Sequence, residues 1–95
     1  MTEYQFHLYV AGDTPRSHLA ATNLRELLRA TGAADHQLDI VDVLERPDLA
    51  EEERILATPY VIKLAPPPAR RVVGDLNDLP RAARALDLQL KEGSS

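Results

Sequence analysis

Prolines bracket an alternating apolar segment in the second half of the chain. Residues 56 to 75 read LATPYVIKLAPPPARRVVGD, with Pro59 directly before the alternation and Pro66 to Pro68 directly after it. Because proline cannot donate a sheet hydrogen bond and restricts the residue before it, these positions fix where a strand starts and where it turns. The pattern predicts a hairpin of two strands, residues 60–64 and 70–73, joined by a stiff triproline turn.

The first half of the chain predicts a strand, a helix and a second strand. Residues 4–10 alternate between apolar and polar side chains, the period of a strand with one buried face. Thr14 and Pro15 then supply an N-cap and a proline at the first helical position, and apolar residues recur at helical spacing up to Gly32. Residues 38–44, LDIVDVL, are β-branched and nearly continuous, which predicts a central strand.

Two further helices are predicted on either side of the hairpin. Asp48 with Glu51 resembles a capping box, and the helix that it starts is expected to run through Leu56. The last helix is expected from Asn77-Asp78, with one apolar stripe that reaches Leu90. We therefore expect a single domain over residues 1–95, structured from about 4 to 90, with a flexible tail at 91–95.

The predicted order is strand, helix, strand, helix, strand, strand, helix. This βαβαββα order resembles the α/β thioredoxin-like fold, a mixed sheet covered by helices on both faces. In that fold a proline with a cis peptide bond typically precedes the first strand of the hairpin. The resemblance therefore makes Pro59 the candidate cis-proline.

Composition and charge exclude several function classes. The chain has 95 residues, 44% of them apolar and 27% charged, with a net charge of −4, which argues against a nucleic-acid partner. No apolar run approaches the ~18 residues of a membrane span, and no basic leader precedes the first strand, so we expect a cytoplasmic protein without a membrane partner. The chain contains no cysteine, which excludes disulfides, thiolate metal sites and dithiol redox chemistry.

The loop after the first strand lacks catalytic groups. Thioredoxin-like enzymes carry their chemistry there, and this chain has AGDTPRS at residues 11–17. The hydroxyls of Thr14 and Ser17 have no base placed beside them by the sequence, so we interpret them as caps. The histidines are on different elements at no metal-ligand spacing and are interpreted as structural or surface residues: His7, His18 and His36. We expect no catalytic, cofactor or metal residue, and no enzyme; a glutathione-using transferase with a hydroxyl in place of the thiol stays open as an alternative.

Four blocks of the sequence resemble one family. They read LYVAGDTP at 8–15, IVDVLERPDLAEEERILATP at 40–59, PPPARRVVGDL at 66–76 and LDL at 86–88, and the match spans about residues 4 to 90. These blocks resemble KaiB, a family of bacterial circadian clock proteins. The resemblance implies a non-enzymatic regulator that binds the N-terminal ATPase ring of the KaiC hexamer and modulates its phosphorylation cycle. It also implies competition with a clock-output histidine kinase and, where KaiA exists, contact with KaiA.

The family resemblance further implies two folds for the C-terminal half. One is a thioredoxin-like monomer competent to bind KaiC, and the other is a resting βαββααβ fold that assembles as a dimer or tetramer. Members commonly have a glycine where this chain has Ala85, and β-branched residues just before it. Alanine favours a helix there by about 2 kcal/mol in sum. We take Ala85 and Asp87 as fold-switch candidates, and expect this chain to populate the thioredoxin-like state more than a typical member.

The candidate KaiC-binding residues follow from the matched blocks. They come from the end of the second strand, the short helix, the proline junction and the hairpin: Asp42, Leu44, Glu45, Pro47, Leu49, Ala50, Glu52, Arg54, Ile55, Pro59, Lys63 and Arg70. Apolar residues beside charges are the usual composition of a binding hot spot with a polar rim. A stress-response adaptor with the same fold stays open as an alternative function.

Overall fold

The computed structural model describes residues 3–33 and 35–89. Its seven elements are β1 (Tyr4–Val10), α1 (Pro15–Ala30), β2 (His36–Asp42), α2 (Pro47–Glu52), β3 (Tyr60–Ala65), β4 (Arg70–Val73) and α3 (Leu79–Ala85). The predicted βαβαββα order is confirmed. The expected helical position of Leu90 and the predicted tail at 91–95 lie outside the described residues. Among the described helices, none has the length and apolar character needed to cross a membrane.

The four strands form one mixed sheet in the order β2-β1-β3-β4. β1 pairs in parallel with β2 and antiparallel with β3, and β3 pairs antiparallel with β4. The prediction of a central strand at 38–44 is therefore wrong in position: β2 is an edge strand, and Ile40 within it is 44% exposed. β-branched residues favour an extended backbone wherever the strand lies, so their run does not require burial on both faces.

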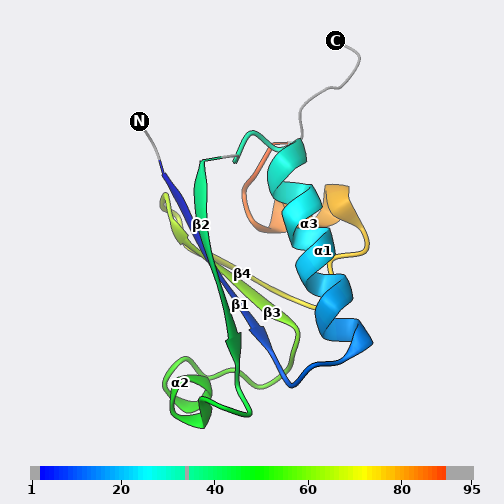
Figure 1. The fold of residues 1–95 in the computed structure, drawn as a ribbon. Coiled ribbons are helices and arrows are strands. Elements are labelled where there is room, and N and C mark those ends of the chain that lie inside the picture. The colour runs from blue at the N-terminus through cyan, green and yellow to red at the C-terminus, as the bar shows by residue number, and fades with distance from the viewer. Residues whose placement is uncertain (1–2, 34, 90–95) are drawn as a thin grey trace.

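The hydrophobic core lies between the sheet and two helices. Figure 1 shows α1 and α3 side by side on one face of the sheet. The inward side chains of β1 (Phe6, Leu8 and Val10) meet the buried leucines of α1, Leu24, Leu27 and Leu28, and Ala82 and Ala83 complete the layer from α3.

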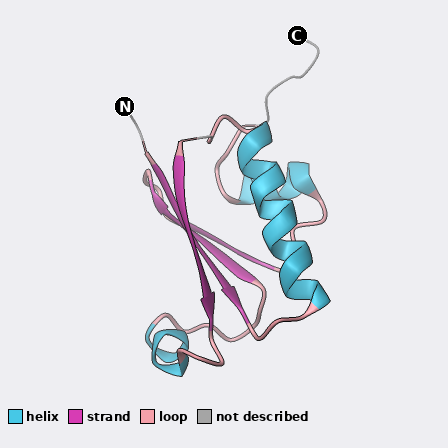
Figure 2. Ribbon diagram, viewed as in Figure 1, coloured by secondary structure: helices cyan, strands magenta, loops and turns pink. Residues whose placement is uncertain are grey.

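The expectation of helices on both faces of the sheet is not met. α2 has 6 residues, none of them buried, and Figure 2 shows it beyond the ends of β1 and β2 rather than over the opposite face. A helix of under two turns presents too little apolar surface to cover a sheet. Within the described residues, this face of the sheet carries no helix.

Capping residues set the helix ends. Thr14 caps α1 by accepting the backbone N–H of Ser17, as the sequence predicts. Asp78 caps α3 by accepting that of Arg81, at the predicted start of this helix. The predicted capping box of α2 is wrong, because Pro47 takes the first helical position and the N-cap is Arg46, whose side chain makes no capping hydrogen bond. α2 also ends at Glu52, before the expected Leu56, and α3 ends at Ala85.

Candidate functional site

Asp42 organises the end of the molecule where α2 lies. Its Oδ1 atom accepts the backbone N–H of Gly12 at 3.0 Å and that of Leu44 at 2.9 Å. The Val43 N–H donates to the carbonyl of Val10 at 2.8 Å just beyond the paired strands. These bonds tie the loop after β1 to the loop after β2, so that the segment leading into α2 has a fixed starting point.

An exposed ion pair precedes α2. The Arg46 guanidinium donates two hydrogen bonds to the carboxylate of Asp48, at 3.3 Å and 3.2 Å. The hydrogen bond from Arg46 lowers the pKa of Asp48, and the same bond raises the pKa of Arg46. Two-point pairing orients both side chains along the first turn of α2, although so exposed a pair adds little to stability.

A left-handed residue ends α2. Arg54 has φ 57°, its N–H donates to the Glu51 carbonyl at 3.2 Å, and the next N–H, of Ile55, donates to the Ala50 carbonyl at 2.8 Å. This is a Schellman arrangement, which reverses the chain direction at a helix end. It leaves the Arg54 side chain exposed and turns the chain toward β3.

Apolar and charged side chains are exposed together around α2. We define the α2 surface as the candidate residues at this end of the molecule: Asp42, Leu44, Glu45, Pro47, Leu49, Ala50, Glu52, Arg54 and Ile55. Leu44 is 70% exposed, whereas Leu49 and Ile55 are half-buried. The sequence reasoning missed Leu56, which was expected to end a helix and instead is 94% exposed in the following loop. A protruding leucine beside charges is typical of a protein-binding surface.

Three candidate residues lie apart from the α2 surface. Pro59 is buried, and its peptide bond with Thr58 is cis. Arg70 is exposed, but it begins β4 beside the triproline turn, which Figure 1 shows at the opposite end of the hairpin from α2. Lys63 is 1% exposed, so its expected role as a surface contact is corrected.

The burial of Lys63 follows from strand register. Its partners in the register are Phe6 on β1 and Arg70 on β4, and Phe6 belongs to the core on the face that α1 and α3 cover. Burial lowers the pKa of the Lys63 ammonium; Asp87 raises it and Arg70 lowers it further. A lysine placed in this layer cannot reach a partner that docks on the sheet or on α2 without the helices moving.

On the helix-free face of the sheet, Tyr9 lies beneath charged neighbours. Its side chain is 2% exposed, and burial together with the negative charge of Glu53 raises the pKa of its phenol. Arg71 donates a hydrogen bond to the hydroxyl of Tyr60 at 3.5 Å, which raises the pKa of Arg71. Tyr9 and Tyr60 are register partners on β1 and β3, so both rings lie on this face.

The loop after β1 uses its polar groups for local structure. The Thr14 hydroxyl accepts the Ser17 N–H at 3.1 Å and donates to the Ser17 hydroxyl at 2.9 Å, while His18 pairs with Asp13. His7 contacts Tyr9 and Asp39, and His36 lies 2.6 Å from the carbonyl of Ala33. Across residues 3–33 and 35–89, no group of three His, Asp or Glu side chains is arranged to hold a metal ion.

Comparison with known proteins identifies the family. The KaiB domain model matches residues 7–88. The chain is 49% identical over 89 residues to a circadian clock oscillator protein KaiB of Prochlorococcus marinus, covering 94% of this chain and 76% of that protein. It is 47% identical to the protein of the same name from Synechococcus sp. (strain RCC307), covering 94% of this chain and 81% of the other. These relatives are named as clock proteins and not as enzymes.

Solved structures agree with the fold. The N-terminal domain of Synechococcus elongatus SasA superposes with a TM-score of 0.73 at 24% identity, covering 92% of this chain and 86% of that one. Mitochondrial thioredoxin 3 of Saccharomyces cerevisiae superposes with a TM-score of 0.67 at 17% identity, covering 92% and 79%. Both show the thioredoxin-like architecture alone. With the domain model matched over most of its length, the chain belongs to the KaiB family of circadian clock proteins.

Proposed function

We propose that this protein is a non-enzymatic clock regulator that binds the N-terminal ATPase ring of KaiC through the α2 surface and thereby modulates the phosphorylation cycle of KaiC. The observation that carries the proposal is the 70% exposure of Leu44, which precedes Glu45 on a loop whose backbone is hydrogen-bonded to Asp42. An apolar side chain held out into water gains free energy when a partner covers it.

The anchoring of the α2 surface supports a binding role. Asp42 fixes the start of this segment through two hydrogen bonds, and the Schellman arrangement at Arg54 fixes its end. A surface that is ordered before association loses less conformational entropy on binding. The α2 surface carries both charges, with Glu45, Glu52 and Arg54 all exposed, which favours recognition of a partner surface that also carries both charges.

The absence of cysteine from the chain supports regulation rather than redox catalysis. A thioredoxin-like scaffold without a thiol at the loop after β1 cannot carry out disulfide exchange, because that reaction needs a thiolate. Competition with a clock-output histidine kinase for one site on KaiC is proposed on the likeness of this fold to the SasA N-terminal domain. We also propose that the protein contacts KaiA where KaiA exists, that its resting state is a dimer or tetramer, and that it is located in the cytoplasm.

Co-elution with the cognate KaiC hexamer in ADP and in ATP tests the proposal. Arg54→Glu is expected to weaken binding at least about tenfold, since it reverses a charge in the interface. Arg54→Gln is a matched variant with the same backbone strain, and its loss of affinity should be smaller. Arg25→Glu, on the exposed side of α1, should bind as the wild type does. Failure of the wild type to associate with KaiC in either nucleotide would reject the proposal.

A further inference from the structure

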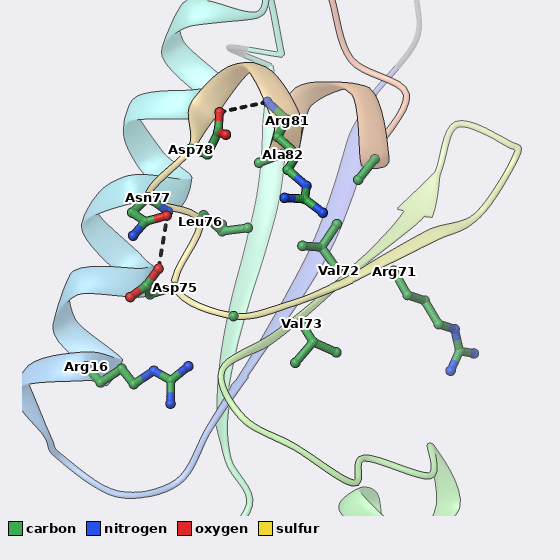
Figure 3. Close-up of a pocket in the computed structure, with 12 residues that line it drawn as sticks. Arg16, Arg71, Val72, Val73, Asp75, Leu76, Asn77, Asp78, Arg81 and Ala82 are labelled. Atoms are coloured by element: carbon green, nitrogen blue, oxygen red, sulfur yellow. Dashed lines mark hydrogen bonds between the residues drawn. The ribbon is translucent and has the colours of Figure 1, made fainter.

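A second concave site lies away from the α2 surface. An open pocket of about 500 Å³ is lined by residues from the start of α1, strand β4, the loop that follows it and α3. Arg16 and Arg81 line its polar side, and Val72, Leu76 and Ala82 form its apolar floor (Figure 3). The volume is within the ~300–1,000 Å³ range of small-molecule sites. None of the residues that line the pocket belongs to the α2 surface.

Arginine and aspartate side chains both line this pocket. The chain carries a net charge of −4, yet three of its 11 Lys and Arg residues line this one pocket: Arg16, Arg71 and Arg81. Within residues 3–33 and 35–89, the ion pairs to carboxylates involve none of the three. Figure 3 shows Arg16 and Arg81 on either side of the loop after β4, whereas the Arg71 side chain extends away from both, toward Tyr60 on the helix-free face of the sheet.

The two carboxylates of the pocket are engaged by the backbone. Asp75 accepts the N–H of Asn77 at 3.2 Å, and Asp78 accepts the N–H of Arg81 at 3.2 Å (Figure 3). Each bond occupies one oxygen of its carboxylate. Among the described residues, no carboxylate forms an ion pair with Arg16 or Arg81, so their guanidinium groups are available to an external anion.

The loop that forms the pocket is held from two sides. The Asn23 side chain donates to the Asp75 carbonyl at 2.8 Å from α1, and the Gly74 N–H donates to the Pro59 carbonyl at 2.8 Å. Gly74 has φ 118°, a conformation that requires glycine, and a Cβ built on it would meet nothing within 4 Å. The bend is thus fixed by hydrogen bonds and open on the pocket side.

We propose that this pocket binds a small organic dianion with an apolar body, held by Arg16 and Arg81 over the Val72 and Leu76 floor. A guanidinium pairs in a two-point manner with either a phosphate or a carboxylate, and the charge of a dianion matches two such groups. Phosphomonoesters and aromatic dicarboxylates share this chemistry. The inference is independent of KaiC binding, because the two sites share no residue.

Titration of the ¹⁵N-labelled protein followed by NMR tests the proposal. Phenyl phosphate and phthalate are the two probes, with inorganic phosphate and sodium sulfate at matched ionic strength as controls. We expect saturable shifts of the Gly74 to Ala82 amides with at least one probe, and weaker binding of the two inorganic anions because they lack an apolar body. Saturation by phenyl phosphate alone assigns a phosphomonoester, saturation by phthalate alone a dicarboxylate, and saturation by both the shared dianion chemistry.

Matched variants complete the test. Arg16→Gln and Arg81→Gln each remove one exposed charge and are expected to weaken the binding of the effective probe at least about tenfold. Arg84→Gln lies on the same helix outside the pocket and should bind as the wild type does. Shifts that stay linear with concentration, that are equal for all four anions, or that persist in both pocket variants would overturn the proposal.

Discussion

The backbone N–H of Gly12 donates a hydrogen bond to Oδ1 of Asp42, 3.0 Å away and 30 residues further along the chain. The same oxygen accepts the N–H of Leu44 at 2.9 Å. One carboxylate oxygen thus joins the loop after β1 to the loop before α2. These hydrogen bonds anchor the start of the α2 surface.

Removal of that carboxylate should loosen the α2 surface. Asp42→Ala leaves two N–H groups without their partner, and we expect the free energy of unfolding to fall by about 1–3 kcal/mol. Asp42→Asn retains an oxygen acceptor and should lose less. Urea unfolding of both variants measures the difference, and hydrogen exchange should show faster exchange at Leu44 in Asp42→Ala. Equal stability of the two variants would show that the acceptor role of Asp42 is unimportant.

Ala85 is expected to hold the last turn of α3. Glycine in its place costs a helix about 1 kcal/mol, or roughly a fivefold change in population. We therefore predict that Ala85→Gly raises the oligomeric, strand-richer fraction relative to the wild type. Circular dichroism and size-exclusion chromatography measure it. An unchanged fraction would contradict the helix-propensity argument for the choice between the two folds.

Two positions further on, at Asp87, glycine should instead be preferred over alanine. Asp87 has φ 58° at the end of α3, where the Leu88 N–H donates to the Ala83 carbonyl at 2.7 Å. A Cβ is disfavoured in this left-handed conformation, so Asp87→Ala should be less stable than Asp87→Gly by about 1 kcal/mol. Both variants lack the carboxylate, so the comparison isolates the backbone. Thermal unfolding measures the difference, and an Ala variant as stable as the Gly variant would count against a left-handed end of α3.

Lys63 is predicted to destabilise this fold at neutral pH. Burial lowers the pKa of its ammonium in the folded state, so folding disfavours the charged form. Stability should therefore rise as pH increases from the lowered folded pKa toward the unfolded value near 10.5. Lys63→Met, of similar volume and without charge, is expected to be more stable than the wild type by about 1 kcal/mol at pH 7.

The gain from Lys63→Met should shrink as the pH approaches 10.5, since the wild-type lysine then loses its charge in both states. Denaturant unfolding of wild type and variant at pH 7, 9 and 10 measures this convergence. Arg25→Met, an exposed position, controls for the general effect of removing a positive charge. A constant or growing difference between wild type and Lys63→Met would exclude the burial of charge as its cause.

Local chemistry determined the order of the elements. Three kinds of signal act within a few residues and can be recognised without knowledge of the fold. They are the alternation at residues 4–10, the helix caps Thr14 and Asp78, and the prolines on either side of β3. The α2 boundaries could not be predicted as well. Pro47 and Asp48 both favour a helix start, and α2 begins at Pro47.

The sequence by itself determined the βαβαββα order, the lack of a thiol and the family. Tertiary structure alone decided that β2 is an edge strand, that Lys63 is buried while Leu56 is exposed, and that Arg16 and Arg81 line one pocket. The physical reason is the separation along the chain of the residues that interact. Periodicity and capping depend on neighbours a few residues apart, whereas strand pairing and burial depend on contacts between segments that the chain separates by tens of residues.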